Sequence, residues 1–438
     1  MQDCSTLLET AVQLQRSGEF VKAAGLYAEI LAIDPNHAQA KFLQGILVHK
    51  ADHLLTMGIC YAGLFDYEKA MNALTQSIAL RPQNAEAHLT LGKVLHMIGE
   101  SRSAIDSCRR ALQIDPALIE AHLVLSIALL SLGDYADGWK EYEWRQKWAR
   151  IDNAERSFSQ PQWLGEPLEG RTILLHAEQG FGDTLEFVRY VPLVAEAGGR
   201  VILEIHPALY TLLQHTPGAA QCVRVGDPLP DFDLQCPLMS LPLAFGTTLQ
   251  TIPPLIPLVP LLIAEPAPRV KPRVGLVWAG NGEHKSDGQR SIELKQFAPL
   301  WRLADAVEFL SLQKGPPQAQ LTQTELPFAI ENAVASANDF SDTAQIIAGL
   351  DLVISVDTAV AHLAGSMLKP VWILVAPAPD WRWGMNDEST PWYPTVRLFR
   401  ATRAGGWPEL LERVATELEA YCGGAGKLLL PSFSSSRT

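Results

Sequence analysis

The sequence predicts an α-helical solenoid followed by two doubly wound α/β domains. Two observations carry this prediction. Up to about residue 150, helix-type apolar patterns recur with a period of 34 residues, which is typical of a repeat array. From Ser157 onward, short β-type runs alternate with helical runs, which indicates βα units around parallel sheets. The chain of 438 residues, 47% of them hydrophobic, has enough apolar material for about three domains.

The repeat is clearest between Pro82 and Pro116, which lie 34 residues apart and each follow a helix-like run. The segment between them contains two helical faces separated by Gly99, which breaks the helical pattern. Each face carries a small residue, at Gly92 and at Ala104. Small side chains at these positions predict that the two antiparallel helices approach each other closely.

Similar units precede and follow this one. The matching positions are Leu14, Gly18, Ala23, Tyr27 and Pro35, then Met57, Gly58, Tyr61, Ala70 and Leu74, and finally His122, Leu125, Leu129, Gly133 and Tyr142. The interval from Pro35 to Pro82 is 13 residues longer than one period, so residues 36–50 predict an extra or lengthened helix. The pattern resembles the tetratricopeptide repeat, with three to four units over residues 5–150. Stacked units of this kind form a concave groove that binds peptides or proteins. The alternative is that the repeats only mediate assembly or brace the chain.

The second part of the chain predicts two sheets. Strands are expected at Thr172–His176, Val201–Ile205, Val274–Trp278, Val307–Leu312, Leu352–Ser355 and Val371–Val375. Helices are expected at Thr184–Glu196, Ala208–His215, Gln296–Leu303, Asp342–Leu350, Thr358–Met367 and Pro408–Tyr421. A proline-rich stretch from Leu229 to Pro272 separates the two groups. The predicted organisation is repeats at 1–150, a linker at 151–170, a first Rossmann-like domain at 171–265, a second at 266–423 and a disordered tail at 424–438.

The first candidate motif follows the first strand, at residues 176–192. Gly180 and Gly182 allow a tight turn and a close approach of the backbone to a ligand. We expect a helix to start near Asp183, with Asp183 or Thr184 as its cap. The alternative interpretation is that Asp183 does no more than cap this helix.

The second candidate motif is at residues 351–375, where an apolar strand ends at Asp357 and Thr358 opens a helix. In open α/β sheets, ligands bind beyond the carboxyl ends of the strands. The helix start offers free N–H groups and a partial positive charge that suit a pyrophosphate. Thr358 and His362 are four residues apart and therefore share one helix face. The alternative is that Asp357 only caps and His362 only packs.

The third candidate motif is the loop after the strand at Val274–Trp278, and a shorter loop follows the next strand. Their polar residues are Asn281, His284, Lys285 and Arg290 in the first loop, and Gln313 and Lys314 in the second. Cations at the carboxyl end of a strand suit phosphate neutralisation. The alternative is a solvated surface loop.

Two further features give weaker signals. Trp381 and Trp383 follow the last main strand and would either stack on a sugar or base or pack between the domains. Asp231 and Asp233 form an Asp-x-Asp pair, which is typical of metal-dependent glycosyltransferases. Two residues in an acidic loop are a weak signal, and a chance occurrence is the favoured interpretation.

The segments EQGFGDT, VWAGN, SLQKG and ISVDTAVAHLAG, in this order, together resemble the C-terminal half of bacterial tetratricopeptide-repeat glycosyltransferases. That half is similar to the lipopolysaccharide heptosyltransferase family, which has the GT-B fold of two Rossmann-like domains. The resemblance covers roughly residues 165–420. It implies an inverting glycosyltransferase that takes a nucleotide-sugar donor and needs neither a metal nor another cofactor.

The resemblance also implies roles for individual residues. The aspartate of the glycine loop, here Asp183, is the general base for the acceptor hydroxyl. Lys285 contacts the donor phosphate, a role that Arg290 can share. The residues matching the nucleotide-sugar segment are Asp357, Thr358, Ala359, Val360 and His362. At Ala359 many family members have glycine. The short first domain implies an acceptor site different from that of heptosyltransferases.

Composition limits the partners. The net charge is −13, with −3 in residues 1–150 and −10 in the remainder, and no basic face suggests nucleic-acid binding. Six widely spaced cysteines indicate neither a disulfide framework nor a zinc site, and they fit a reducing cytoplasm. No signal peptide or membrane span is expected. The partners that the resemblance implies are a nucleotide-sugar and a protein or glycan acceptor in the repeat groove, and homo-oligomer formation through the repeats is a further expectation.

Two alternatives to a transferase stay open. The first is a non-catalytic repeat scaffold whose transferase region is degenerate. The second is an enzyme of the nucleotide-sugar epimerase type with the GT-B fold.

Overall fold

The computed structural model describes residues 3–151, 158–258, 270–282, 287–402 and 405–423. The chain divides into two compact units. The first consists of Met1–Leu129 and Glu141–Ala154, and the second of Leu130–Lys140 and Glu155–Thr438. The predicted tail at 424–438 and the position of Lys285 lie outside the described residues.

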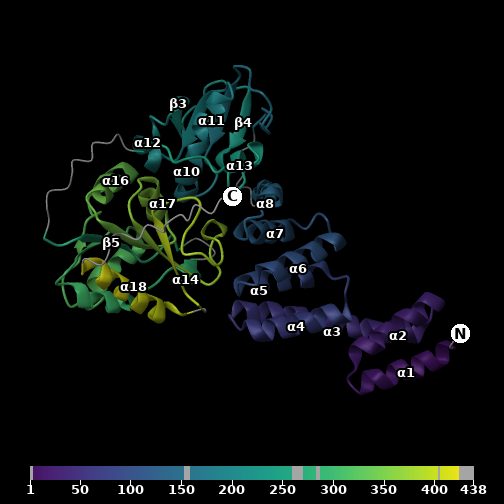
Figure 1. The fold of residues 1–438 in the computed structure, drawn as a ribbon. Helices are drawn as coiled ribbons and strands as arrows, with labels where there is room; N and C mark the ends of the chain where they lie inside the picture. Colours follow the sequence, from purple (N-terminus) through teal and green to yellow (C-terminus); the bar gives the residue numbers. More distant parts are fainter. Residues whose placement is uncertain (1–2, 152–157, 259–269, 283–286, 403–404, 424–438) are drawn as a thin grey trace. The chain divides into compact units, whose positions relative to one another are not determined.

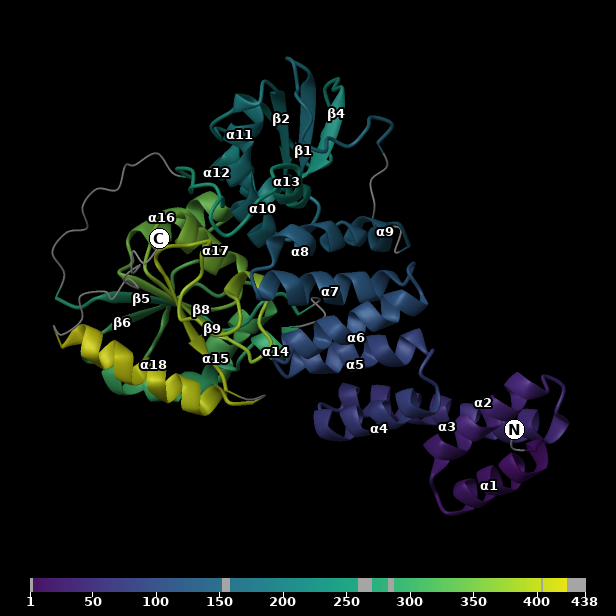
Figure 2. The same cartoon turned by 45° about the vertical axis from the view of Figure 1, so that its right-hand side comes forward.

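The first part of the chain is entirely helical. Its helices are α1 (Cys4–Arg16), α2 (Phe20–Ile33), α3 (Ala38–Gly63), α4 (Tyr67–Leu80), α5 (Ala85–Met97), α6 (Ser101–Ile114), α7 (Ile119–Ser131), α8 (Tyr135–Tyr142) and α9 (Trp144–Ile151). Within the first unit, α1 packs on α2, α3 on α4 and α5 on α6, and successive hairpins stack on one another (Figures 1 and 2). This arrangement confirms the predicted repeat array.

Glycines set the spacing within the hairpins. A Cβ atom on Gly92 would lie 2.7 Å from the Sγ of Cys108 and 3.4 Å from the carbonyl oxygen of Ala104. A Cβ atom on Gly58 would lie 2.6 Å from Cγ of Leu74. Neither distance leaves room for a side chain, so the prediction that small residues bring paired helices close together is confirmed.

The predicted irregularity near residues 36–50 is confirmed as well. Helix α3 runs without interruption for 26 residues, about twice the length of its neighbours α2 and α4. It begins after His37, whose Nδ1 accepts a hydrogen bond from the backbone N–H of Ala40 at 3.3 Å. The residues in excess of one repeat period therefore lengthen a single helix, α3.

The second unit contains two parallel sheets. The first has the strands β1 (Thr172–His176), β2 (Arg200–Ile205), β3 (Ala219–Arg224) and β4 (Leu234–Pro237), with α10 (Phe181–Phe187), η1 (Val188–Tyr190), α11 (Val191–Glu196), α12 (Pro207–Leu213), η2 (Leu238–Ser240) and α13 (Leu241–Ala244). The second has β5 (Arg273–Val277), β6 (Glu308–Ser311), β7 (Glu331–Asn332), β8 (Leu352–Val356), β9 (Val371–Val375) and β10 (Val396–Arg400), with α14 (Asp287–Arg290), η3 (Leu294–Leu303), η4 (Pro316–Ala319), α15 (Gln320–Gln323), α16 (Phe340–Ala348), α17 (Ala359–Ser366), η5 (Trp381–Trp383) and α18 (Trp407–Cys422).

Strand order identifies where each sheet changes direction. The first sheet has the order β3-β2-β1-β4 and the second β10-β9-β8-β5-β6-β7, and all recorded pairs are parallel. The order reverses between β1 and β4 in the first sheet and between β5 and β8 in the second. Such switch points are where doubly wound sheets bind ligands, beyond the carboxyl ends of the strands.

The predicted α-solenoid followed by two Rossmann-like domains is therefore confirmed, with differences in detail. The sequence prediction missed β3, β4, β7 and β10. β4 and β7 are short, and β3 is largely exposed and lacks an apolar run. The helix predicted at 296–303 is a 3-10 helix, η3, with Pro299 inside it. The helix predicted at 184–196 is divided into α10, η1 and α11. None of the helices in the described part of the chain is long and apolar enough to cross a membrane.

The second sheet has an extensive apolar core. Leu276, Ile354 and Leu374 from adjacent strands are buried against helix α18 (yellow in Figure 1) through Leu411 and Val414. In β5, a Cβ atom on Gly275 would lie 2.7 Å from Cδ1 of both Leu312 and Leu350. This tight packing gives a rigid base for the loops at the carboxyl edge.

The beginning of α8 packs within the second unit. Tyr135 and Trp139 lie in an aromatic cluster with Phe187, Trp381 and Trp392, at centroid distances of 5.1–6.4 Å. The indole N–H of Trp392 donates to the hydroxyl of Tyr135 at 3.0 Å. The sequence assigned residues up to 150 to the repeats, whereas the structure groups residues 130–140 with the α/β unit.

Candidate functional site

The glycine loop after β1 carries Asp183 on the first turn of α10. The helix begins at Phe181, earlier than predicted, and Asp183 is its third residue. Oδ2 of Asp183 accepts a hydrogen bond from the backbone N–H of Gly180 at 2.8 Å. A carboxylate in this position also interacts favourably with the positive end of the helix. Thr184 is buried, and its hydroxyl donates to the carbonyl of Gly180 at 3.4 Å.

Gly182 brings this loop against the second sheet's helix α17. A Cβ atom on Gly182 would lie 2.8 Å from Cδ2 and 3.2 Å from Nε2 of His362. The two helices pack on each other. Any side chain at Gly182 would therefore separate the two candidate motifs.

Asp357 directly follows β8, at the switch point of the second sheet, and Thr358 is the N-cap of α17. The first intrahelical N–H contact of this helix is that of Ala361 with the carbonyl of Thr358. The backbone N–H groups of Ala359 and Val360 precede it, and such groups have no acceptor within their own helix. The structure thus places the predicted residues at the position expected for an anion-binding helix start.

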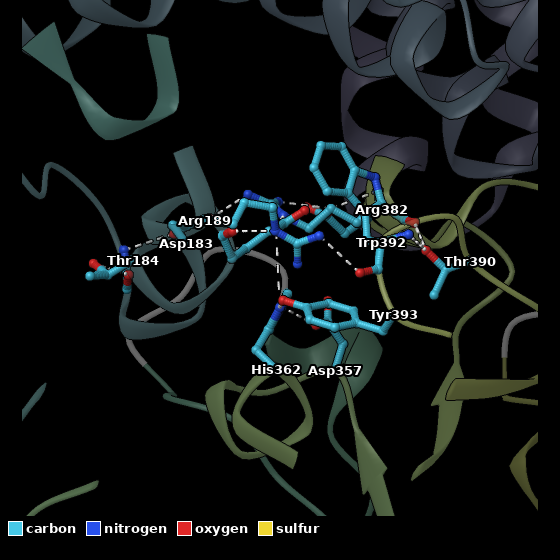
Figure 3. A network of polar contacts seen from close by, with 12 residues as sticks. Asp183, Thr184, Arg189, Asp357, His362, Arg382, Thr390, Trp392 and Tyr393 are labelled. Atoms are coloured by element: carbon cyan, nitrogen blue, oxygen red, sulfur yellow. Dashed lines mark hydrogen bonds and ion pairs between the residues drawn. The ribbon is translucent and has the colours of Figure 1, made fainter. Parts of the chain in front are cut away.

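Arg382, in the loop after β9, connects this loop to helix α10 (Figure 3). Its Nη2 donates to Oδ1 of Asp183 at 2.5 Å, and its Nε donates to Oε2 of Glu186. Its Nη1 donates to Oδ1 of Asp380 at 3.0 Å. One buried guanidinium therefore binds three carboxylates, two from α10 and one from its own loop.

His362 belongs to the same network. Its Nδ1 is 2.8 Å from the hydroxyl of Tyr393, and its Nε2 is 3.9 Å from Oδ1 of Asp357. Burial lowers the pKa of His362 well below its ordinary value, and nearby arginines act in the same direction. Burial raises the pKa of Tyr393, so its phenol is protonated. A neutral imidazole that accepts from this phenol carries its proton on Nε2, the nitrogen on the side of Asp357.

Two carboxyl groups, the buried Glu186 and the half-buried Asp357, have shifted pKa values. Burial raises the pKa of Glu186 to about 7, although Arg382 and Arg189 favour its charged form. Burial also raises the pKa of Asp357, and the neighbouring carboxylate of Asp380 adds to this effect. Groups with shifted pKa values gather at functional sites more often than elsewhere.

Arg189 crosses the same interface in the opposite direction. It extends from η1 of the first sheet's domain, and its Nη1 donates to the backbone carbonyls of Trp392 at 3.1 Å and Pro253 at 3.4 Å. Its Nε donates to the carbonyl of Glu186 at 2.7 Å. Arg189 therefore binds backbone atoms, whereas Arg382 binds carboxylates.

Of the residues in the predicted cationic loop after β5, Arg290 lies near this network. Arg290 pairs with Asp287 at 3.4 Å and lies close enough to Asp357 to stabilise its charged form. Asn281 is exposed, and Lys285 lies outside the described residues.

Gln313 and Lys314 are engaged by the protein itself. The amide of Gln313 is buried and exchanges hydrogen bonds with the backbone of Trp278 and Ala279. Lys314 donates to the carbonyl of Ala337. Gln313 thus supports the loop after β5, and Lys314 contacts the segment between β7 and α16; their predicted contact with the donor stays a prediction.

The two weaker features have structural explanations. Trp381 and Trp383 are buried: Trp381 packs in the aromatic cluster and Trp383 lies 5.2 Å from the ring of His362. Their burial and ring contacts favour the interpretation that both tryptophans pack against other side chains of the protein. Asp233 accepts a hydrogen bond from the backbone N–H of Thr172 at 2.8 Å and so supports the start of β1. Among the described residues, no three His, Cys, Asp or Glu side chains are grouped as metal ligands.

Sequence reasoning missed four residues of the network: Glu186, Arg189, Arg382 and Tyr393. Glu186 is three residues after Asp183, so helical spacing was a usable signal. Arg382 lies between Trp381 and Trp383 in the sequence. No sequence signal links either residue to its partner about 200 positions away.

The fold and the site define a class. A helical repeat array precedes two Rossmann-like domains, and the candidate motifs lie beyond the carboxyl ends of strands in both sheets. This is the architecture of a tetratricopeptide-repeat protein with a GT-B region.

Comparison with known families agrees with this class. Residues 66–99 match the tetratricopeptide-repeat family, and residues 315–410 match "Glycosyltransferase family 9 (heptosyltransferase)". The second match includes Asp357, His362 and Arg382. These findings confirm the resemblance to tetratricopeptide-repeat glycosyltransferases.

Individual relatives cover the chain to different extents. Protein FlbA of Caulobacter vibrioides is 26% identical over 409 residues, which is 84% of this chain and 66% of FlbA. Photosystem I assembly protein Ycf3 of Acaryochloris marina is 29% identical over 98 residues, which is 22% of this chain and 53% of that protein. The chain thus spans less than two thirds of each of these relatives. Among solved structures, an O-GlcNAc transferase mutant of Thermobaculum terrenum is 17% identical, with a TM-score of 0.33 over 96% of this chain and 92% of that one.

Proposed function

We propose that the protein is an inverting glycosyltransferase that moves a sugar from a nucleotide-sugar to a protein or glycan acceptor without a metal ion. One observation carries this proposal. Asp183 from the first sheet's domain and the start of helix α17 from the second are brought together by the packing of α10 on α17, and Arg382 of the second sheet's domain binds Asp183. A base and an anion-binding helix start are the two groups that this reaction requires.

The donor would bind at the second sheet. Its diphosphate would accept hydrogen bonds from the N–H groups of Ala359 and Val360 at the positive end of α17. Arg290 lies near Asp357 and would share the phosphate charge with Lys285. Asp357 would accept hydrogen bonds from sugar hydroxyls. These contacts stabilise the charge that develops on the leaving diphosphate.

The acceptor would bind on the side of Asp183, whose side chain is 21% exposed. Asp183 takes the proton from the acceptor hydroxyl while that oxygen attacks the anomeric carbon. The bond from this carbon to the diphosphate oxygen breaks, and the diphosphate leaves with the electron pair. Attack opposite to the leaving group inverts the anomeric centre.

The repeats would recruit the acceptor, because stacked repeats present a concave binding surface. We place the reaction in the cytoplasm on the basis of the cysteine pattern. The alternative, a non-catalytic scaffold, predicts that no nucleotide or nucleotide-sugar binds.

The test uses the full chain with UDP-, ADP-, GDP- and dTDP-sugars, radiolabelled in the sugar, and an extract of bacterial protein and glycan as acceptor. Wild type is expected to label macromolecules from at least one donor. Asp183→Asn is expected to lose about 10²-fold or more in rate while it still binds the nucleoside diphosphate in calorimetry. The matched control is Glu412→Gln, an exposed carboxylate paired with Arg302, which is expected to leave the rate unchanged. Full activity of Asp183→Asn would rule out its role as base, and absence of binding by every nucleotide would favour the scaffold.

A further inference from the structure

The neighbours of Asp183 point to a group that controls it. Both carboxylate oxygens are held: Oδ2 by the backbone of Gly180 and Oδ1 by Nη2 of Arg382. The side chain is nonetheless 21% exposed. Asp183 therefore has a fixed orientation and one accessible side, which is what a base needs to meet an acceptor hydroxyl.

Contacts within its own loop orient the side chain of Arg382. Asp380 accepts from Nη1 of Arg382 at 3.0 Å and also caps the short helix η5 through the backbone N–H of Arg382 at 3.1 Å. The guanidinium lies 4.3 Å from the ring of Trp381. These contacts all come from the loop of Arg382, so they fix its direction independently of α10.

Glu186 provides a second anchor on the same helix. It is one helical turn after Asp183, so the two carboxylates lie on one face of α10. Arg382 binds Asp183 through Nη2 and Glu186 through Nε. Two contacts one turn apart fix the rotation of α10 about its axis, and a single contact would not.

We propose that Arg382 is a positioning residue: by binding Asp183 and Glu186 together, it sets the direction of the Asp183 carboxylate and links this direction to the packing of α10 on α17. The inference rests on the proposed function, because it takes Asp183 to be the base. Arg382 itself need not contact either substrate.

A purely structural role is the competing explanation, and Arg189 offers a matched comparison. Arg189 is equally buried and crosses the same interface, but its hydrogen bonds go to backbone carbonyls. Arg189→Gln should therefore loosen the interface without changing the contacts of the Asp183 carboxylate.

The experiment measures kcat and KM of the full chain for the labelled nucleotide-sugar that wild type uses, with thermal midpoints for every variant. Arg382→Gln is expected to lower kcat by about 10²-fold with little change in KM, because a displaced base costs about this much. Arg382→Lys should recover part of this loss, since an ammonium keeps one contact to Asp183 but cannot bind three carboxylates. Arg189→Gln should lower the thermal midpoint by a similar amount with a much smaller change in kcat.

A double-mutant cycle gives the sharpest outcome. In the Asp183→Asn background, Arg382→Gln should lower the residual rate by less than about threefold, because groups that act as a unit are not additive. An equal loss in both backgrounds, or a raised KM with an unchanged kcat, would overturn the inference. If Asp183→Asn has no measurable rate, equal kcat losses in Arg382→Gln and Arg189→Gln overturn it instead. A wild type that transfers no sugar would overturn the proposed function and this inference together, whereas an active wild type with an additive cycle overturns this inference alone.

Discussion

The contacts inside the first unit differ in kind from those inside the second. In the first unit, small residues such as Gly92 and Gly58 let neighbouring helices touch, and the contacts join residues about 16 positions apart. In the candidate site of the second unit, Arg382 and Glu186 are buried charged side chains that meet across 196 positions. The first kind of contact repeats along the chain, whereas in the site one side chain, Arg382, binds both Glu186 and Asp183. The packing of the repeats therefore depends on shape, and the arrangement of the site depends on specific charged partners.

The largest expected effect tests the aromatic cluster of the second unit. Trp139→Ala should lower the free energy of unfolding by about 3–5 kcal/mol, because it removes a fully buried ring that packs on Trp381 and Phe187. Trp144→Ala is the matched change in the first unit, where a half-buried indole stacks on His122. It should cost clearly less. Chemical denaturation followed by circular dichroism measures both, and equal costs would remove the distinction between the units.

The next effect tests spacing in the repeats. Gly92→Ala should destabilise the protein by about 1–3 kcal/mol, because the added methyl group has no space beside Cys108. Gly45→Ala is the matched control within helix α3, where nothing lies within 4 Å of the added atom. This control should stabilise the protein by about 0.5–1 kcal/mol, since alanine favours helix. Thermal unfolding should therefore shift in opposite directions, and shifts of the same sign would contradict the packing argument.

The last comparison tests the buried charge of Glu186. Burial raises its pKa from 4.5 to about 7, so the folded state binds the proton more tightly than the unfolded state. Stability from this group is complete below about pH 4.5 and is lost as the pH rises through about 7. In Glu186→Gln the loss should disappear, which changes the slope of stability by on the order of 1 kcal/mol per pH unit in this window.

The measurement for Glu186 is a pair of denaturation series from pH 4.5 to pH 7, window limits that follow from its shifted pKa. The lowered pKa of His362 acts in the opposite direction, since it favours the folded state as the pH rises toward 6.5. This contribution is present in both proteins, so it largely cancels in the difference. Parallel curves for wild type and Glu186→Gln would show that the carboxylate of Glu186 does not titrate in this range.

The sequence predicted the repeats and most strands because their signals are local. The strands Thr172–His176 and Val371–Val375 were located to the residue, since each is an apolar run between clear breaks. The lengthened helix α3 followed from one interval between prolines. The backbone hydrogen bonds of Gln313 and Lys314 were not predicted, because hydrogen-bond partners cannot be read from residue type.

The sequence predicts the two motifs of the site separately. Asp183 and Asp357 each follow a recognisable strand, so each could be placed at the carboxyl edge of its own sheet. The packing of α10 on α17 and the contact of Arg382 with Asp183 depend on how two domains pack, and no periodicity encodes this. The same holds for Arg189, because its contacts with Trp392 and Tyr393 form only where the two domains pack.

The close approach at Gly92 also determines the chemistry of one thiol. Burial raises the pKa of Cys108 to about 12, so this cysteine carries almost no thiolate at neutral pH. Cys60, on the neighbouring hairpin, is exposed. A thiol-reactive dye would therefore label Cys60 at once and Cys108 only when α5 and α6 part. The ratio of the two labelling rates reports how often the repeat opens, so the chain contains both a reporter of local unfolding and its reference.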